Sequence, residues 1–299
     1  MTPIVIGADS TVYGDNMIKS GNLYLVTGGS GFLGHPLVTE ILKQGGLVRV
    51  IARNEGNLIK LQQSHPSVEI YTGDVSDPFS AMQAMAGVNG VFHLAAFKHV
   101  GLAETFARES IHSNVIGSMN ILSLSLQNDL DFVIGISTDK AAQVSGVYGA
   151  TKLLMERLFL QYSLLNPDCE YRIVRYGNVL YSTGSVLCKW KELIQAGKEV
   201  TVTDLQATRF FWSVDQAVNL IFDCLEESDG VEPYCPSMKS MSIQNLLNAM
   251  IEKYGNGKAI PIKTIGLQPG ENMHEKVLDE GPYSNEVEQF TIESIKKLI

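Results

Sequence analysis

One short stretch of this chain gathers the residue types that move protons. Ser137-Thr138-Asp139-Lys140 is followed by Tyr148 and Lys152, so an acid, an amine and a Tyr-Lys pair fall within sixteen residues. Tyr148 and Lys152 are four residues apart and share one face if the segment is helical. A tyrosine hydroxyl titrates at about pH 10 and is a poor base at neutral pH. A nearby ammonium lowers that pKa, so the stretch predicts acid–base chemistry. An ordinary helix with an exposed lysine is the alternative.

A glycine-rich loop precedes this stretch in the chain. It joins a predicted strand that ends at Thr27 to a predicted helix that starts at Pro36. Gly28 would permit a tight turn, Gly31 a close approach of the backbone to a pyrophosphate, and Gly34 close packing of helix on sheet. The helix N-terminus would attract phosphate. A turn without a ligand is the alternative, but the strand–loop–helix setting favours dinucleotide binding. The residues expected to contact the cofactor here are Gly28, Ser30, Gly31, Phe32, Leu33 and Gly34.

The end of the second predicted strand bears on the type of cofactor. An acid at this position would hold the ribose 2′-hydroxyl of NAD, but the position holds Ala52 and is followed by Arg53. A guanidinium fits a 2′-phosphate, so we predict NADP. NAD remains the alternative, with Glu55 as the acid and Arg53 as a solvated charge. Asp74 and Val75 are expected at the adenine edge, although Asp74 could equally cap a turn or helix.

Further elements must position these residues. Short apolar runs alternate with amphipathic stretches, which predicts a Rossmann-like α/β fold with a doubly wound parallel sheet covered on both faces. The predicted strands are Leu23–Thr27, Leu47–Ala52, Val68–Thr72, Gly90–Ala95, Asp131–Ser137 and Tyr171–Tyr176. The predicted helices include Pro36–Lys43, Asn57–Gln63, Glu104–Asn128, Ser213–Glu227 and Ile243–Tyr254.

The rhythm of strands and helices breaks at about Gly177. We therefore expect a dinucleotide-binding domain over residues 23–177, to which residues 205–228 return, and a smaller C-terminal substrate-binding region over residues 178–299. Residues 1–22 precede the first strand and are expected to form an added arm or hairpin, whose role does not follow from the sequence.

Composition excludes several classes of function. The chain has 299 residues and a formal net charge of −9, which argues against nucleic acid as a partner. No apolar run approaches the roughly 20 residues that a membrane helix needs, and no signal peptide is evident, so a cytoplasmic location is expected. The four cysteines are scattered without a CxxC pair, and the histidines lack ligand spacing, so no metal site and no disulfide framework are predicted.

Taken together, these motifs resemble the extended short-chain dehydrogenase/reductase family over roughly residues 23–280. The shared motifs are Thr27–Gly34, Leu94-Ala95-Ala96, Ser137–Lys140, Tyr148–Lys152 and Arg175–Val179. Within that family the chain is most similar to the inverting UDP-N-acetylglucosamine 4,6-dehydratases of the flagellin-glycan and capsule type. The motifs typical of that branch are Ala95-Ala96-x-Lys98-His99-Val100, Thr138-Asp139-Lys140, Gly184-Ser185-Val186, Thr208-Arg209-Phe210, and Pro269-Gly270-Glu271 followed by His274-Glu275.

The resemblance implies roles for the acid–base residues. Tyr148 would take the proton of the sugar 4-hydroxyl, held by Thr138, while the hydride passes to NADP. The resulting ketone acidifies carbon 5. Asp139 would then protonate the leaving 6-hydroxyl if burial raises its pKa, and Lys140 would remove the carbon-5 proton if its surroundings keep it neutral. The hydride returns to carbon 6, so the cofactor is recycled. A surface ion pair is the alternative reading of Asp139 and Lys140.

Substrate and cofactor contacts follow from the same resemblance. Ala95 and Ala96, with Tyr148 and Lys152, would line the cofactor. The residues that would face the UDP-sugar are Lys98, Asn178, Arg209 and Glu271, although Arg209 could instead be structural. His93 is read as a core or near-cofactor histidine. Because relatives commonly form dimers or hexamers, a homo-oligomer is expected.

The chain departs from the family pattern in three loops. The family usually has proline within Gln143-Val144-Ser145, Asp-Pro within Asp204–Ala207, and Arg-Pro-Gly-Glu-Lys at Gln268–Asn272. Two cationic side chains are thus missing from a loop expected to cover the substrate, which leaves the nucleotide sugar open. A UDP-sugar epimerase or a 5,6-dehydratase is the enzymatic alternative, and a non-catalytic NADP-binding sensor or scaffold is the alternative of another class.

Overall fold

Six short apolar strands form the central sheet of the computed structural model, which describes residues 18–299. They run parallel in the order β3-β2-β1-β4-β5-β6. Their bounds are Leu23–Thr27 for β1, Leu47–Ala52 for β2, Glu69–Thr72 for β3, Gly90–His93 for β4, Phe132–Thr138 for β5 and Glu170–Tyr176 for β6. The central strands are buried along nearly their whole length, as parallel strands covered on both faces must be. The predicted Rossmann-like fold class is confirmed.

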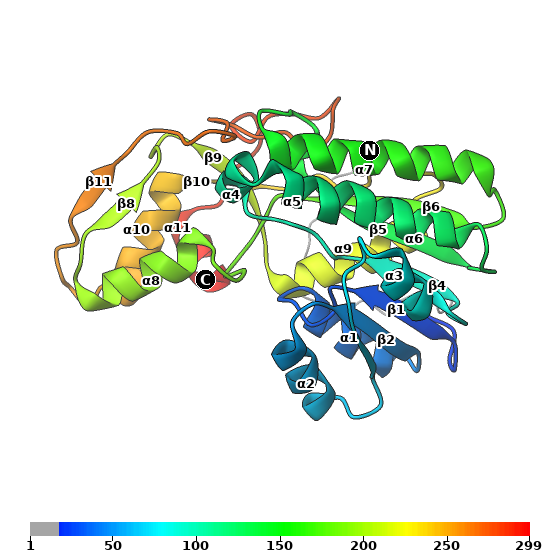
Figure 1. Cartoon of the computed structure of the whole chain (residues 1–299). Coiled ribbons are helices and arrows are strands. Elements are labelled where there is room, and N and C mark those ends of the chain that lie inside the picture. Colours follow the sequence, from blue (N-terminus) through cyan, green and yellow to red (C-terminus); the bar gives the residue numbers. More distant parts are fainter. Residues whose placement is uncertain (1–17) are drawn as a thin grey trace.

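Helices cover both faces of this sheet. One face carries α1 (Gly34–Lys43), α2 (Glu55–Ser64) and α9 (Val214–Glu227), whose apolar residues share one core cluster with β1 and β2. The other face carries α3 (Pro78–Met85), α6 (Gly117–Ser125) and α7 (Val147–Leu165). Figure 1 shows α5 and α6, one after the other along the same line, beside α7 on the second face. The long helix α7 packs on β5, the strand that precedes it in the chain.

The single helix predicted over Glu104–Asn128 is wrong in detail. The segment forms α4 (Val100–Thr105), α5 (Ala107–Ile111), a π-helical turn η1 (His112–Ile116) and α6. Phe106 leaves the helical region at φ −117° and separates α4 from α5. In the π turn, the buried Asn114 side chain accepts from the Phe97 N–H at 2.7 Å and donates to the Thr151 hydroxyl at 3.0 Å. The turn thus joins the loop after β4 to α7.

A smaller region follows β6 and lies at one end of the molecule, on the left of Figure 1. Its strands are β7 (Asn178–Val179), β8 (Val200–Val202), β9 (Thr208–Trp212), β10 (Ser240–Ser242) and β11 (Ile262–Thr264). They form a β10-β9-β7 sheet and a β11-β8 pair. Helices α8 (Val186–Ala196), α10 (Ile243–Tyr254) and α11 (Ile292–Leu298) enclose a separate apolar core with these strands. The domain bounds drawn from the sequence stay a prediction.

The residues just before β1 pack onto the central sheet. Ile18 is fully buried in the first core cluster, and the Lys19 ammonium lies 3.0 Å from the Asp131 carboxylate. Most of the arm predicted over residues 1–22 lies outside the described residues. Within residues 18–299, no helix combines the length and the apolar content needed to cross a membrane.

Candidate active site

The glycine loop after β1 lies at the carboxyl edge of the sheet, beside the end of β4. Gly28 has a φ of +69°, and a Cβ there would lie 3.0 Å from the Ala95 nitrogen. A Cβ on Gly34 would lie 2.5 Å from the Gly29 Cα. Both positions therefore exclude a side chain, as the sequence predicts. A Cβ on Gly31 would meet only the Gly28 carbonyl, at 3.1 Å, so the loop is open on this side.

The amino end of α1 fits a phosphate. Leu33 occupies the N-cap position, no side chain caps the helix, and no acidic residue stands in its first turn. Ser30 and Phe32 lie in the turn that leads to it. The Thr27 hydroxyl accepts from the Ala95 N–H at 3.0 Å, which holds the Ala95-Ala96 segment beside the loop. An uncapped helix end with this loop fits the pyrophosphate of a dinucleotide.

Arg53 and Asp74 come together at the ends of β2 and β3. Arg53 Nη1 lies 3.5 Å from Asp74 Oδ2, and the Arg53 side chain is 61% exposed. Asp74 Oδ1 also accepts from the N–H and the hydroxyl of Ser76, which is the turn-capping role that the sequence left open. Val75 is buried against Gly117, where a Cβ would lie 2.7 Å away. The guanidinium is therefore accessible, whereas Val75 is part of the core.

The predicted acid–base residues meet where β5 ends. Thr138 is its last residue, and Asp139 and Lys140 begin the 3-10 turn η2 (Asp139–Ala141). Asp139 Oδ1 accepts from the Thr138 hydroxyl and from Lys140 Nζ, both at 2.9 Å. Asp139 is fully buried, so the pair is not the surface ion pair that the sequence left open. A Cβ on Gly149 would lie 2.3 Å from the Lys140 carbonyl. The absence of a side chain at position 149 therefore lets the Lys140 backbone approach α7.

The Tyr-Lys pair differs from the expectation in one respect. Lys152 is buried, and its Nζ donates to Met155 Sδ at 3.2 Å. Burial lowers the pKa of Lys152 to about 8, against the opposing charge of Glu156. Burial raises the pKa of Tyr148, and the Lys140 charge and the Thr138 hydroxyl oppose that rise. The ammonium that acts on Tyr148 in this structure is therefore that of Lys140.

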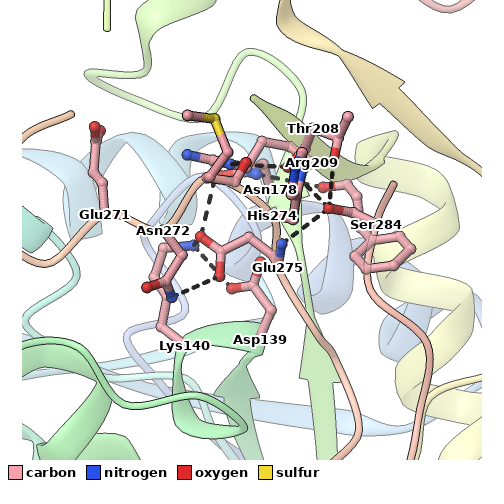
Figure 2. A network of polar contacts seen from close by, with 12 residues as sticks. Asp139, Lys140, Asn178, Thr208, Arg209, Glu271, Asn272, His274, Glu275 and Ser284 are labelled. Atoms are coloured by element: carbon pink, nitrogen blue, oxygen red, sulfur yellow. Dashed lines mark hydrogen bonds and ion pairs between the residues drawn. The ribbon is translucent and has the colours of Figure 1, made fainter. Parts of the chain in front are cut away.

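A carboxylate that the sequence analysis did not assign completes this centre (Figure 2). Glu275 Oε1 lies 3.6 Å from Lys140 Nζ and 3.8 Å from Arg209 Nε. Burial lowers the pKa of Lys140, but the charges of Asp139 and Glu275 outweigh burial and bring the pKa to about 12. Lys140 is thus an ammonium here, and the neutral state that the predicted base requires is not its resting state. Burial raises the pKa of Glu275.

Of the predicted substrate residues, Lys98 and Glu271 lie in loops, Asn178 lies on β7 and Arg209 lies on β9. Lys98 Nζ donates to the Thr183 carbonyl at 3.3 Å, and Asn178 Nδ2 to the Phe210 carbonyl at 3.4 Å. Arg209 is buried, and its Nη1 donates to the Thr208 and Met273 carbonyls, which is the structural role left open for it. Glu271 stands apart from the network in Figure 2, and its carboxylate accepts from the Gln268 N–H at 3.0 Å. Only Arg209 of these four contacts Glu275.

Sequence reasoning also left the surroundings of His93 undefined. His93 is buried, with Nδ1 2.9 Å from the Thr27 hydroxyl and Nε2 2.9 Å from the Ser118 hydroxyl. Burial lowers its pKa to about 3, and the charge of Lys152 acts in the same direction. His93 is therefore neutral and joins β4 to the glycine loop.

The sequence contained one signal for Glu275. The His274-Glu275 dipeptide is a motif of the dehydratase branch that the chain resembles, but the motif does not say where the carboxylate lies in the structure.

Comparison with known proteins identifies the family. The fold is that of the extended short-chain dehydrogenase/reductases. Residues 24–297 match the family described as polysaccharide biosynthesis protein, and the chain belongs to this family. The chain is 39% identical to an uncharacterised membrane protein of Methanocaldococcus jannaschii over 86% of this chain and 80% of that protein. It is 32% identical to the inverting UDP-N-acetylglucosamine 4,6-dehydratase of Campylobacter jejuni, over 91% of this chain and 82% of that enzyme. The resemblance stated from the motifs is thereby confirmed.

Other relatives carry a different activity in their names. The UDP-glucose 4-epimerase of Rickettsia rickettsii is 32% identical over 85% of this chain and 76% of that enzyme. Among solved structures, Pen from Bacillus thuringiensis superposes with a TM-score of 0.89 at 28% identity, covering 95% of this chain and 98% of that one. DesIV, a dTDP-glucose 4,6-dehydratase from Streptomyces venezuelae solved with NAD, shares the fold with a TM-score of 0.77 at 18% identity, over 92% and 95% of the two chains.

Proposed function

We propose that this protein is an NADP-dependent nucleotide-sugar 4,6-dehydratase, a lyase that acts on UDP-N-acetylglucosamine or a close relative. The observation that carries the proposal is the buried Asp139–Lys140 pair, which lies beside Tyr148 at the carboxyl edge of the sheet. A simple oxidoreductase needs no second acid–base pair next to its tyrosine. The named C. jejuni relative performs such a dehydration, which supports the proposal.

The oxidation step uses Tyr148 and Thr138. Tyr148 removes the proton of the sugar 4-hydroxyl, and the Thr138 hydroxyl holds the same oxygen. A bound nicotinamide dinucleotide would accept the hydride of carbon 4 and return it to carbon 6. Lys152, whose pKa is lowered by burial, lies one helical turn beyond Tyr148 on α7 and would face the ribose and the phenol once the site is filled. The new ketone at carbon 4 makes the proton on carbon 5 acidic.

The elimination step then uses the ion pair itself. In the resting pair Lys140 holds the proton and donates it in a hydrogen bond to Asp139 Oδ1. Transfer of that proton along the 2.9 Å hydrogen bond gives a neutral amine and a neutral acid. Lys140 then takes the carbon-5 proton while Asp139 protonates the 6-hydroxyl. The bond between carbon 6 and that oxygen breaks, water leaves, and a double bond forms between carbons 5 and 6. Both groups return to their resting charges. When the hydride came back to carbon 6, Lys140 would give a proton to carbon 5, and the proton that Tyr148 took from the 4-hydroxyl would replace it, so the cycle needs no outside proton.

The choice of NADP over NAD as the cofactor remains a proposal. The exposed Arg53 guanidinium at the end of β2 supports a 2′-phosphate contact, and no acid occupies position 52. DesIV was solved with NAD, which keeps NAD as the alternative. A cytoplasmic location and a homo-oligomeric state also stay predictions of the sequence analysis.

A reaction in deuterated water separates the candidate activities. With UDP-N-acetylglucosamine the proposal expects a 4-keto-6-deoxy product with deuterium at carbon 5. A UDP-sugar that changes configuration at carbon 4 without loss of water would show an epimerase, which the R. rickettsii relative makes the second candidate. A 5,6-unsaturated product would show a 5,6-dehydratase, and binding without turnover a sensor or scaffold.

A Lys140→Ala variant tests the residue assignment. It should bind substrate and build up the reduced nicotinamide absorbance, more slowly than the wild type because Tyr148 remains but loses the neighbouring ammonium, and it should not release water. Dehydration by this variant at the wild-type rate would remove Lys140 from the proposal.

A further inference from the structure

Glu275 is a buried carboxylate that the proposed steps do not use. Its side chain is 1% exposed, and its Oε1 has no hydrogen-bond partner although it lies between Lys140 Nζ and Arg209 Nε. Oε2 accepts from Asn272 Nδ2 at 3.3 Å. Burying a carboxylate costs several kcal/mol unless its charge is well compensated. A buried carboxylate oxygen without a hydrogen bond therefore calls for a functional explanation.

The backbone around Glu275 is held in place by buried polar groups. The Glu275 N–H donates to the Ser284 hydroxyl at 2.9 Å, and the Ser284 N–H donates to the Glu275 carbonyl at 2.8 Å. The Ser284 hydroxyl also lies 2.7 Å from the Thr208 hydroxyl on β9, and Ser284 is fully buried. Figure 2 shows these contacts to the right of the carboxylate. The side chain is therefore aimed at Lys140 by a fixed main chain.

The charges around Lys140 form an alternating set. Asp139 and Glu275 both lie close to the Lys140 ammonium, and Arg209 lies next to Glu275, so two acidic and two basic groups stand together in a largely buried cluster. A long lysine side chain held by one carboxylate could turn about its flexible stem. Two carboxylates fix both the position of Nζ and the affinity of the pair for its proton.

We propose that Glu275 is a positioning residue of the elimination step, which holds the Lys140 amine against Asp139 and sets where their shared proton resides. This inference rests on the proposed dehydratase function. Glu275 acts through Lys140 and touches neither sugar nor cofactor in the proposed steps. Its removal should therefore lower kcat for dehydration and leave KM nearly unchanged.

The experiment compares Glu275→Gln and Glu275→Asp with the wild-type holoenzyme. Wild-type turnover of UDP-N-acetylglucosamine is measured first, and its failure would reject the proposed function before any variant is tested. Given turnover, Glu275→Gln should lower kcat by about 10²-fold, the scale of a misplaced acid–base group. Loss of its charge should also move the alkaline limb of the pH profile down by about one unit or more. Glu275→Asp keeps the charge and should restore the limb, with a partial recovery of kcat.

A substrate with deuterium at carbon 5 shows whether the Glu275 variants slow the removal of the carbon-5 proton. The isotope effect on kcat should grow in Glu275→Gln, because proton removal becomes slower. Glu280→Gln, an exposed change in the same segment, is the matched control and should behave as wild type. An unchanged rate and profile in Glu275→Gln would overturn the inference. Equal losses in both Glu275 variants with an unmoved alkaline limb and isotope effect would also overturn it, since they would indicate a purely structural role.

Discussion

The carboxylate of Glu104 accepts a hydrogen bond from the backbone N–H of Val147, with 2.6 Å between Oε1 and N. Val147 is the first residue of α7, and the N-cap position before it is Gly146, which has no side chain to serve as a cap. The cap therefore comes from α4, and a negative charge at this end also suits the helix dipole. Tyr148 follows directly, so a residue of α4, well before α7 in the chain, sets the start of the helix that bears Tyr148.

Glu104→Ala should remove this cap. We expect a loss of about 1 kcal/mol in the free energy of unfolding, the usual cost of a lost helix cap. Dehydration should slow as well, because the first turn of α7 carries Tyr148. Urea denaturation and steady-state kinetics measure the two effects. Glu109→Ala, an exposed change on α5, is the control. Equal stability of the Glu104 and Glu109 variants would show that the contact does not stabilise α7.

Gly149→Ala should destabilise the protein although alanine favours helices. A Cβ at position 149 would lie 2.3 Å from the Lys140 carbonyl, so η2 and α7 would have to move apart. We expect a loss of about 1–3 kcal/mol and a fall in dehydration of about 10²-fold from displaced groups. Gly101→Ala on α4 meets no atom within 4 Å and should gain up to about 1 kcal/mol. Thermal unfolding of both variants gives the comparison, and a stabilised Gly149→Ala would contradict the packing argument.

His93 should make the protein sensitive to acid. Burial lowers its pKa from 6.5 to about 3. Between these values the unfolded chain binds a proton that the folded protein does not, so the free energy of unfolding falls as the pH falls. From pH 6.5 to about pH 5 the loss from this group is about 2 kcal/mol. The urea midpoint should fall less steeply with falling pH in His93→Asn than in the wild type. The exposed His112→Asn variant should show the wild-type dependence on pH. Identical slopes in all three proteins would contradict a buried neutral His93.

Arg53→Gln should weaken NADP binding and spare NAD. A charge-assisted hydrogen bond contributes about 1.5–3 kcal/mol, which corresponds to about 10- to 100-fold in the dissociation constant. Isothermal titration with both cofactors measures the difference, and Arg108→Gln on the surface of α5 is the control. If the wild-type protein binds NAD more tightly and Arg53→Gln changes neither affinity, the cofactor is NAD.

The sequence was most informative where a single local pattern determines the structure. The strand predictions match β1 and β2 at both ends and the other four strands to within two residues, because apolar runs bounded by turns identify buried parallel strands. The roles of Gly28 and Gly34 also follow from their place between a strand and a helix. Asp139 and Lys140 were found because they directly follow a strand whose end faces the site.

The remaining features depend on contacts between distant segments. In the π turn Asn114 bonds to the loop after β4, and helical periodicity contains no information about that partner. The break at Phe106 was likewise not visible in the periodicity. Glu275 is separated from Lys140 by well over a hundred residues. Against the effect of burial, Asp139 raises the pKa of Lys140 most, and Glu275 adds to that rise, so only the part that comes from Asp139 could be read from the residues around position 140.

The segment that carries Glu275 is attached on both sides. The Met273 carbonyl accepts from Arg209 on β9, and the Val277 carbonyl accepts from Arg175 on β6. These two arginines stand on different sheets, and Glu275 lies midway between the two attachment points. An inserted or deleted residue between positions 273 and 277 would break one attachment or turn the carboxylate away from Lys140. The number of residues between positions 273 and 277 is thus constrained, whatever their types. Homologues with an insertion or deletion in this stretch are expected to lack a carboxylate beside the lysine that corresponds to Lys140.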